Sequence, residues 1–317
     1  MLTHLHIQNF KCFEDLRIDN LARVNLITGK NNTGKTSLLE AVYVAYGKDN
    51  WYKILKSRGE NASSSNLIEK FDAHASLFFN RNIVADAHIN TAVLQMINTR
   101  TGRLYTSSER DMYLENLDSR LTLLNDPDAR SCNWVNSTVL GMSELESLWD
   151  RSFFLTPFED IALTLLRHIE KDIEKIGLGK APGGERRFQV LLKGQKRPIP
   201  LGHLGEGMSR ILGMVMSLVD GENGILLIDE FENGLHYTIQ PEIWKHLFSL
   251  AKELNVQVFV TTHSKDCVEA FARAANMPEN EGSARVIRLF NKDGRISESL
   301  FDQEDIRTAL EQHIDLR

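Results

Sequence analysis

The sequence predicts an α/β fold, in which helices cover a largely parallel sheet. Two apolar runs, residues 224–228 and 256–261, are typical of strands that are buried on both faces. A third run, residues 24–28, stops at a glycine and is followed by residues with helical spacing. Strands and helices therefore alternate along the chain, which is the pattern of an α/β core.

The composition is that of an ordinary globular protein. Of 317 residues, 42% are hydrophobic and 25% are charged, which excludes a disordered or collagen-like chain. No stretch approaches the roughly 18 apolar residues of a membrane span, and residues 1–11 lack the features of a signal peptide. We therefore expect a cytoplasmic protein without membrane association. Three widely spaced cysteines (Cys12, Cys132 and Cys267) predict neither a disulfide framework nor a metal site.

The formal net charge of -6 excludes a wholly basic nucleic-acid binder, but one segment is locally basic. Residues 180–197 carry a local charge of +5, because this segment contains six lysine or arginine residues and one glutamate. If residues 186–192 form a strand, Arg186 and Arg187 lie on opposite faces and do not extend one basic stripe. DNA or an acidic partner can then contact the turn, and a solvated hairpin tip fits equally well. The turn cations are Lys193, Lys196 and Arg197.

The chain is predicted to open with a β-hairpin. Residues 3–8 alternate in polarity as a half-buried strand does, residues 9–13 form a turn, and residues 16–18 form a second strand. Residues 24–28 then form the apolar strand, a glycine loop follows, and a helix extends from Thr36.

Residues 50–182 carry few landmarks and are predicted to form an inserted β and helical region. They contain a polar loop at residues 58–66, strands near residues 89–98 and 104–107, and helical stretches up to about Gly177. Sustained heptads do not occur, which excludes long coiled-coil arms.

A second set of elements follows this block. Residues 188–192 are predicted to form a strand, residues 193–195 a turn, and residues 198–200 the approach to a helix that begins near Gly207.

The glycine loop at residues 29–36 carries the strongest chemical signal. It matches G-x4-G-K-[ST] and lies between a buried strand and a helix, the context that phosphate binding needs. Its N–H groups can wrap a phosphate, Lys35 can neutralise phosphate oxygens, and the Thr36 hydroxyl can bind Mg²⁺. Asn32 stands where glycine is common, but asparagine readily adopts left-handed backbone angles. The predicted phosphate-binding residues are Gly29, Lys30, Asn31, Asn32, Thr33, Gly34, Lys35, Thr36 and Ser37.

Two adjacent carboxylates, Asp229 and Glu230, end the apolar strand at residues 225–228. Alone, this pattern is usually a strand that runs into a solvated turn. Beside a phosphate loop, it predicts that Asp229 holds Mg²⁺ next to Thr36. Glu230 is then placed to orient or deprotonate the attacking water.

Two further features fit a nucleotide site. His263 follows the buried strand at residues 256–261 and is a candidate contact to the γ-phosphate. Residues 204–210 form a glycine-bearing loop that opens a helix, so they present a second set of N–H donors to an anion. An ordinary helix start is the simpler alternative for this loop.

These motifs together resemble the ABC-type ATPase superfamily, in its branch of RecF-like, SMC-like and OLD-like standalone AAA-family ATPases. The resemblance implies an ABC-type P-loop NTPase head with an N-terminal antiparallel β subdomain and an inserted mostly helical subdomain. A single domain would cover residues 1–317, with residues 1–48 and 185–300 as the nucleotide-binding core. The matching segments are N-F-K-C-F at residues 9–13, the phosphate loop, a signature loop at 204–208, Asp229 with Glu230, a D-loop at 232–236, and His263 as the switch histidine.

The resemblance also implies ATP binding and hydrolysis with Mg²⁺. Lys35, Glu230 and His263 would be catalytic, and Thr36 and Asp229 would be the metal ligands. The family pattern implies a head-to-tail homodimer that closes on ATP, because the helix start at Gly207 has no second phosphate in its own chain. Further implied nucleotide contacts are Lys11, Gly205, Glu206, Gly207 and Met208.

The sequence departs from the family pattern in several places. Gly205 replaces the serine of transporter signatures, which suits the branch between RecF and OLD. The Q-loop glutamine has two competing positions, Gln95 and a strand end at residues 153–156. The 54 residues after His263 are too few for a Toprim nuclease domain, and Asp126-Pro127-Asp128 is interpreted as a solvated turn. Any nuclease is therefore expected on another chain.

Two functions remain open. The first is an ATPase that regulates a separate effector in a prokaryotic anti-phage or toxin-type system, which the chain length, the missing coiled coil and the OLD-like D-loop favour. The second is a RecF-like DNA-repair or recombination clamp that binds duplex DNA through residues 180–197. A transporter ATPase fits less well, because no membrane-coupling partner is visible.

Overall fold

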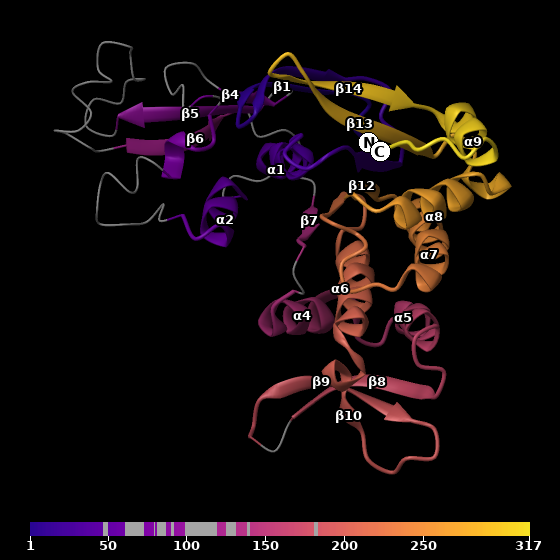
Figure 1. Cartoon of the computed structure of the whole chain (residues 1–317). Helices are drawn as coiled ribbons and strands as arrows, with labels where there is room; N and C mark the ends of the chain where they lie inside the picture. Colours follow the sequence, from indigo (N-terminus) through magenta and orange to yellow (C-terminus); the bar gives the residue numbers. More distant parts are fainter. Residues whose placement is uncertain are drawn as a thin grey trace.

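The computed structural model confirms the predicted α/β fold (Figure 1). The predicted strand at residues 104–107 and the turn Asp126-Pro127-Asp128 lie outside the described residues. Residues 87–89, 92–98 and 119–124 are described by their backbone. The structure describes residues 1–46, 50–60, 73–78, 80, 87–89, 92–98, 119–124, 131–137, 140–180 and 183–317.

A six-stranded sheet organises the molecule. Every neighbouring pair of strands in it is parallel except the last hairpin, β13 with β14. The carboxyl ends of the parallel strands therefore meet at one edge, where ligands bind in folds of this class. In spatial order the strands are β14 (Arg295–Phe301), β13 (Ala284–Lys292), β3 (Val24–Thr28), β12 (Gln257–Thr261), β11 (Ile225–Ile228) and β7 (Cys132–Val135).

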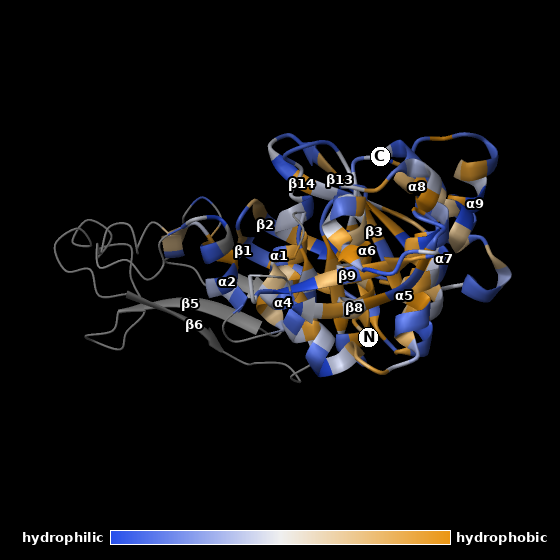
Figure 2. Cartoon of the chain, turned by 90° about the horizontal axis from the view of Figure 1, so that it is seen from below, coloured by the Kyte–Doolittle hydropathy of each residue, from blue (hydrophilic) through white to orange (hydrophobic). Residues whose placement is uncertain are grey.

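The central strands are buried on both faces, as their apolar runs predicted. Neighbouring residues of β11 pack into different cores, Leu226 into one and Leu227 into the other. Figure 2 shows hydrophobic residues gathered on these strands and on α6. One core includes residues of α6 (Glu206–Asp220), α7 (Gln240–Glu253), α8 (Lys265–Ala275) and α9 (Gln303–Glu311), and the other includes residues of α1 (Lys35–Ala45) and α2 (Asn50–Ser57).

An antiparallel sheet begins with the predicted hairpin of β1 and β2, which pair from Leu5 with Ile18 to Phe10 with Phe13. The strand expected near residues 89–98 is two strands, β4 and β5, and β4 joins the hairpin through β1. The sheet order is β2 (Phe13–Ile18), β1 (Leu5–Phe10), β4 (Ala87–Ile89), β5 (Ala92–Asn98) and β6 (Ser119–Leu124).

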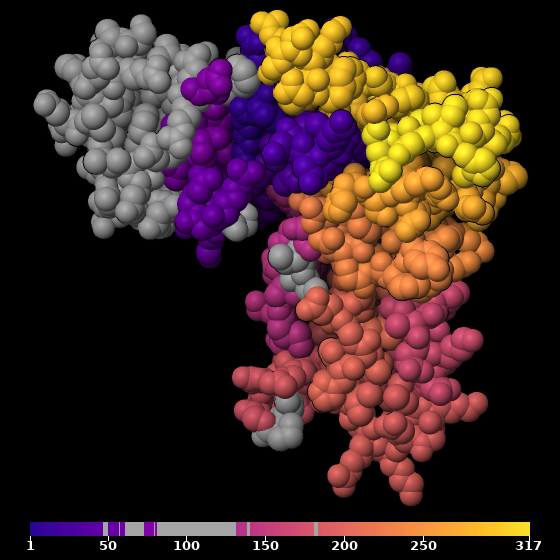
Figure 3. Space-filling model, in the orientation of Figure 1, coloured from indigo at the N-terminus to yellow at the C-terminus, as the bar shows by residue number. Residues whose placement is uncertain are grey.

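A smaller three-stranded sheet lies at the far end of α6 from the six-stranded sheet (Figure 1). The predicted strand near residues 188–192 is confirmed as β9 (Arg186–Leu192), which pairs with β8 (Ile173–Lys180) and β10 (Ile199–Pro200). Helical elements pack between this sheet and α6. They are α4 (Met142–Leu148), a π-helical turn (Trp149–Phe153), α5 (Phe158–Arg167) and a short 3-10 helix (Leu201–Leu204). Figure 3 shows the same part of the molecule as closely packed magenta and salmon residues.

Two strands were missed in the range that was predicted to be helical. β7 has four residues, too few to display a period, yet it pairs with β11 in the core sheet. β8 contains Gly177 and Gly179, and its side chains are mostly half-buried or exposed, so its sequence carries no clear alternation. The pairing with β9 determines its structure, and the helical prediction up to Gly177 is wrong there.

None of the helices in the described residues is long and apolar enough to cross a membrane. The three cysteines are free thiols. After α9, the chain returns to the sheet, where the Thr28 hydroxyl at the end of β3 donates to the Leu316 carbonyl oxygen. The two chain ends overlap in Figure 1 but lie on opposite sides of the molecule in Figure 2.

Candidate nucleotide site

The phosphate loop connects β3 to α1 at the carboxyl edge of the sheet. Gly29 and Gly34 have φ values of 137° and 88°, and a Cβ atom at either would collide with neighbours. At Gly29 it would lie 2.3 Å from the Leu289 carbonyl oxygen, and at Gly34 it would lie 2.6 Å from the Cys12 Sγ. Asn32 has a left-handed φ of 62°, as expected. Both glycines are therefore required by close packing as well as by backbone angle.

The Lys35 ammonium is folded over the loop that precedes it. Its Nζ donates to the carbonyl oxygens of Gly29 at 2.8 Å and Lys30 at 3.0 Å. Partial burial lowers the pKa of Lys35, while the carboxylates of Asp229, Glu230 and other neighbours oppose that shift. The loop thus holds the Lys35 ammonium close to where a phosphate would bind. Phosphate oxygens are stronger acceptors than the two carbonyl oxygens and would replace them as partners of this ammonium.

The hydroxyl of Thr36 joins the phosphate loop to β11. It donates to the two Asp229 carboxylate oxygens at 3.2 and 3.1 Å, and the Thr261 hydroxyl at the end of β12 donates to Oδ1 at 2.5 Å. Burial raises the pKa of Asp229, although the two hydroxyls favour its charged form. The ends of β11 and β12 and the start of α1 therefore place one carboxylate beside two threonine hydroxyls.

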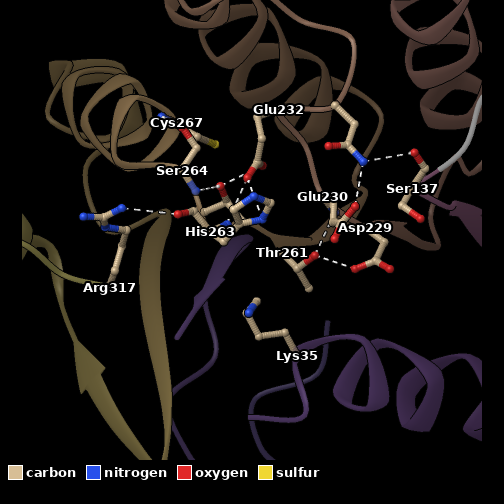
Figure 4. A network of polar contacts seen from close by, with 12 residues as sticks. Lys35, Ser137, Asp229, Glu230, Glu232, Thr261, His263, Ser264, Cys267 and Arg317 are labelled. Carbon is tan, nitrogen blue, oxygen red and sulfur yellow. Dashed lines mark hydrogen bonds and ion pairs between the residues drawn. The ribbon is translucent and has the colours of Figure 1, made fainter. Parts of the chain in front are cut away.

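Glu230 is fixed by both its backbone and its side chain. Its φ of 49° lies in the left-handed region, and its N–H donates to the Thr261 hydroxyl at 2.8 Å. Its Oε2 accepts from the Asn233 amide at 2.6 Å, and the same amide donates to the Ser137 carbonyl oxygen at 3.2 Å (Figure 4). The network holds the second carboxylate in one orientation next to Asp229.

Arg210 supports this edge from α6 and was not predicted. Its side chain is 2% exposed and donates to the carbonyl oxygens of Asp229 at 2.8 Å and Glu230 at 2.7 Å. It also donates to the carbonyls of Asn136 at 3.0 Å and Ser137 at 3.3 Å. Burial lowers the pKa of Arg210, and the nearby carboxylates oppose the shift. A single guanidinium thus fixes the loops that follow β7 and β11.

His263 lies against Glu232 of the D-loop. The His263 N–H donates to Glu232 Oε1 at 3.0 Å, and its Nδ1 lies 3.2 Å from the same oxygen. The Thr262 hydroxyl donates to the other carboxylate oxygen at 2.8 Å. Figure 4 shows the imidazole on the same side of β12 as Lys35 and Glu230, so the structure gathers the three predicted catalytic residues at one edge.

The signature loop packs against the D-loop of its own chain. A Cβ atom at Gly207 would lie 2.4 Å from the Gly234 carbonyl oxygen, so glycine permits this contact. Gly205 has a φ of 104°, and Glu206 begins α6. Met208 is fully buried in the core below α6, and its N–H donates to the Gly205 carbonyl oxygen. The Met208 side chain therefore faces the core, and the expected nucleotide contact of this residue stays a prediction.

The Lys11 side chain points into the protein interior. Its ammonium contacts Glu40 at 2.6 Å, and its side chain is 5% exposed. Arg58 contacts the other Glu40 oxygen at 2.5 Å. The buried carboxylate of α1 holds the Lys11 ammonium in the protein interior, and the expected nucleotide contact of Lys11 stays a prediction.

Residues after β7 also reach the sheet edge, and sequence reasoning missed them. Asn136 and Ser137 follow β7, and the Asp229 N–H donates to the carbonyl oxygen of Val135 at 2.9 Å. Neither candidate for the Q-loop glutamine lies at this edge strand, since Gln95 lies in β5 of the antiparallel sheet. Residues 153–156 begin at the end of a π-helical turn rather than at a strand end.

The arrangement fits MgATP. The two glycines leave a cradle that a Cβ atom would fill, and the loop N–H groups with Lys35 would hold phosphate oxygens. Within the described ranges, no group of three or more acidic, histidine or cysteine side chains can hold a metal ion. Thr36 and Asp229 would therefore hold Mg²⁺ together with phosphate oxygens and water, which is the coordination that this ion prefers.

Two family models match the chain. An AAA domain described as "putative AbiEii toxin, Type IV TA system" matches residues 98–266, which is more than half of the sequence. A second AAA domain matches residues 4–155.

Individual proteins show the same relationship. The chain is 23% identical to an ATP/GTP phosphatase of Helicobacter pylori, over 85% of this chain and 87% of that protein. It is 32% identical to the DNA replication and repair protein RecF of Limosilactobacillus reuteri, over only 22% of this chain and 20% of RecF. The SMC head domain from Thermotoga maritima matches with a TM-score of 0.51 and 15% identity, over 95% of this chain and 99% of that domain, which shows a shared fold.

Proposed function

The chain belongs to the AAA-domain family described as a putative AbiEii toxin of a Type IV TA system and is an ATPase of the RecF-like and SMC-like ABC class; on this basis, we propose that it hydrolyses ATP with Glu230 as the base. One observation carries the proposal. The segments after β3 and β11 bring Lys35, Asp229 and Glu230 to a single edge. Lys35 is bonded to carbonyl oxygens of its own phosphate loop, and Thr261 at the end of β12 bonds the Asp229 carboxylate and the Glu230 N–H.

The residues divide the work of hydrolysis. The N–H groups of the phosphate loop and Lys35 bind the phosphates, and Thr36 and Asp229 hold the metal. When bound, Mg²⁺ supplies positive charge that neutralises phosphate oxygens. Glu230 orients a water molecule and accepts its proton, and His263 contacts the terminal phosphate from β12. Asn233 and Arg210 keep Glu230 in position.

The signature loop supports a head-to-tail dimer as the active form. Among the described residues, no hydrogen bond or ion pair joins residues 205–208 to residues 29–37. We therefore propose that the N–H groups at the start of α6 bind a phosphate other than the one on their own phosphate loop. A partner's ATP would supply that phosphate, so ATP binding would create the dimer interface and hydrolysis would open it.

Two variants test the dimer. Lys35→Ala should lose ATP binding, and Gly207→Asp should bind ATP but stay monomeric in light scattering, because its side chain collides with the Gly234 carbonyl oxygen of the D-loop and its carboxylate repels phosphate. Mixing the two proteins should restore turnover through one intact site per heterodimer. Both proteins must be folded and able to pair; no recovery under those conditions would place the whole site within one chain.

The cellular role proposed for this ATPase is control of a separate effector, nuclease or toxin, in prokaryotic defence. The description of the matching family, which names a putative toxin, supports this role. Trapping the ATP-bound state by Glu230→Gln and identifying the co-purified protein would test it. Capture of the same protein by wild type without ATP would contradict nucleotide control.

DNA binding is the second candidate, and the exposed cations of the β9–β10 turn favour it. Lys193, Lys196 and Arg197 are exposed there, whereas Arg186 already pairs with Asp150 at 2.6 Å. A gel shift at increasing salt distinguishes the candidates, because counterion release makes direct DNA binding fall steeply with salt concentration.

A further inference from the structure

The C-terminal segment, residues 314–317, reaches the nucleotide site from outside any motif. It follows α9 and runs back to the sheet edge, where Leu316 is 3% exposed and belongs to the core beneath α8. The Thr28 hydroxyl donates to the Leu316 carbonyl oxygen at 2.7 Å, in a buried position. Thr28 is the last residue of β3 and precedes Gly29. The segment is thus anchored at the start of the phosphate loop.

The next residue, Arg317, extends from this anchor to the switch histidine. Its guanidinium donates to the His263 carbonyl oxygen at 3.4 Å, and the side chain is 38% exposed. Asp315 holds the guanidinium in place through contacts of 2.6 to 3.0 Å. The long contact to His263 is therefore weak by itself, but the cation that makes it is already oriented.

Two side chains consequently bind the backbone of His263, one at its N–H and one at its carbonyl oxygen. Glu232 accepts its N–H at 3.0 Å, and Arg317 donates to its carbonyl oxygen. Figure 4 shows Glu232 and Arg317 on opposite sides of His263. Two side chains of opposite charge thus bind the two peptide groups that flank the His263 Cα atom, the carboxylate at an N–H and the guanidinium at a carbonyl oxygen.

From this geometry we infer that residues 314–317 form a strap that positions His263, with Arg317 as the positioning residue and Thr28 as its anchor. The strap connects the start of the phosphate loop to the switch histidine within one chain. Its role in turnover rests on the proposed ATPase function, but its effect on His263 exists without nucleotide.

Hydrogen–deuterium exchange of the nucleotide-free protein tests the strap directly. In Arg317→Ala, the amides of residues 262–264 should exchange roughly two- to five-fold faster, the size expected from losing one exposed charge-assisted contact. Arg317→Lys should recover part of the protection. Arg307→Ala, which removes an exposed arginine of α9, should leave these amides unchanged.

A second variant tests the anchor. Thr28→Val keeps the shape of a buried β-branched residue but removes the donor to Leu316, so exchange at residues 262–264 should also rise. The double variant with Arg317→Ala should exchange no faster than the faster single variant, because both changes release the same segment. Full additivity, or no effect of Arg317→Ala beyond that of Arg307→Ala, would overturn the strap.

Turnover provides an independent readout. Arg317→Ala should lower kcat a few-fold with little change in the KM for ATP, because Lys35 and the loop amides still bind the phosphates. An equal rise in KM with unchanged kcat would contradict a role at His263. If wild type itself does not hydrolyse ATP, the proposed function fails, while the exchange experiment still decides whether the strap exists.

Discussion

Charged side chains gather in two regions of this molecule, and the regions differ in how the charges are held. At the carboxyl edge of the six-stranded sheet, Lys35, Asp229 and Glu230 are hydrogen-bonded to other protein groups and partly or fully buried. In the three-stranded sheet, Arg187 pairs with exposed Glu185, and the turn cations project into solvent. The comparison teaches that fixed, desolvated charge marks a place for chemistry, whereas exposed charge marks a surface for partners at most.

A matched pair of substitutions can break this comparison. Arg210→Met should lower the free energy of unfolding by about 3 kcal/mol, because it leaves buried carbonyl oxygens without a donor. Arg187→Met in the three-stranded sheet should change it by less than about 0.5 kcal/mol. Urea unfolding without nucleotide measures both values. Similar losses in the two variants would show that burial does not separate the regions.

Lys11, a buried charge outside both regions, gives a further test of the effect of burial, because it should make the free energy of unfolding depend on pH. Burial lowers the pKa of Lys11 from 10.5 to about 8, outweighing the attraction of Glu40. Between these pH values the unfolded chain binds more protons than the folded one, so this group makes stability rise with pH. The stability of wild type relative to Lys11→Met should increase by up to about 3 kcal/mol between pH 7.5 and 10.5. A constant difference in urea unfolding would refute the lowered pKa.

The turn cations give the smallest expected effect on the enzyme. Replacing Lys193, Lys196 and Arg197 by glutamate should leave ATP turnover without DNA unchanged. These side chains are exposed, and the β9–β10 turn that carries them lies far from the six-stranded sheet (Figure 1). The same variant should lose DNA or effector binding if the turn is the contact surface. Lys175→Glu on the neighbouring strand β8, combined with Lys171→Glu in the turn before it, serves as the control. Persistent binding at matched salt would show that the partner contacts another surface.

The nucleotide site was largely predictable because its chemistry lies in consecutive residues. A phosphate loop places Lys35 and Thr36 next to each other, and Asp229 and Glu230 directly follow an apolar strand. Such local patterns survive in the sequence because the strand end and the functional side chain are adjacent. The three central strands of the sheet were predictable for the same reason.

Contacts between residues far apart in the sequence explain why other parts of the structure were not predicted. Arg210 takes its role from carbonyls that lie 19 to 74 positions away, so no motif announces it. Lys11 is buried by Glu40, 29 positions along the chain, and Met208 points into the core although it adjoins a functional glycine. β7 is too short to show a period and is recognised only by its pairing with β11.

The most direct test of the central claim compares ATP binding and turnover in Glu230→Gln. The amide keeps the shape of the side chain but cannot accept the proton of water, so turnover should fall by roughly 10²- to 10⁴-fold, about 3 to 5 kcal/mol of barrier. ATP affinity, measured by equilibrium titration, should stay close to that of wild type, since Lys35 and the loop amides are unchanged. Wild-type turnover in Glu230→Gln would contradict the assignment of the base and, with it, the proposed chemistry of the sheet edge.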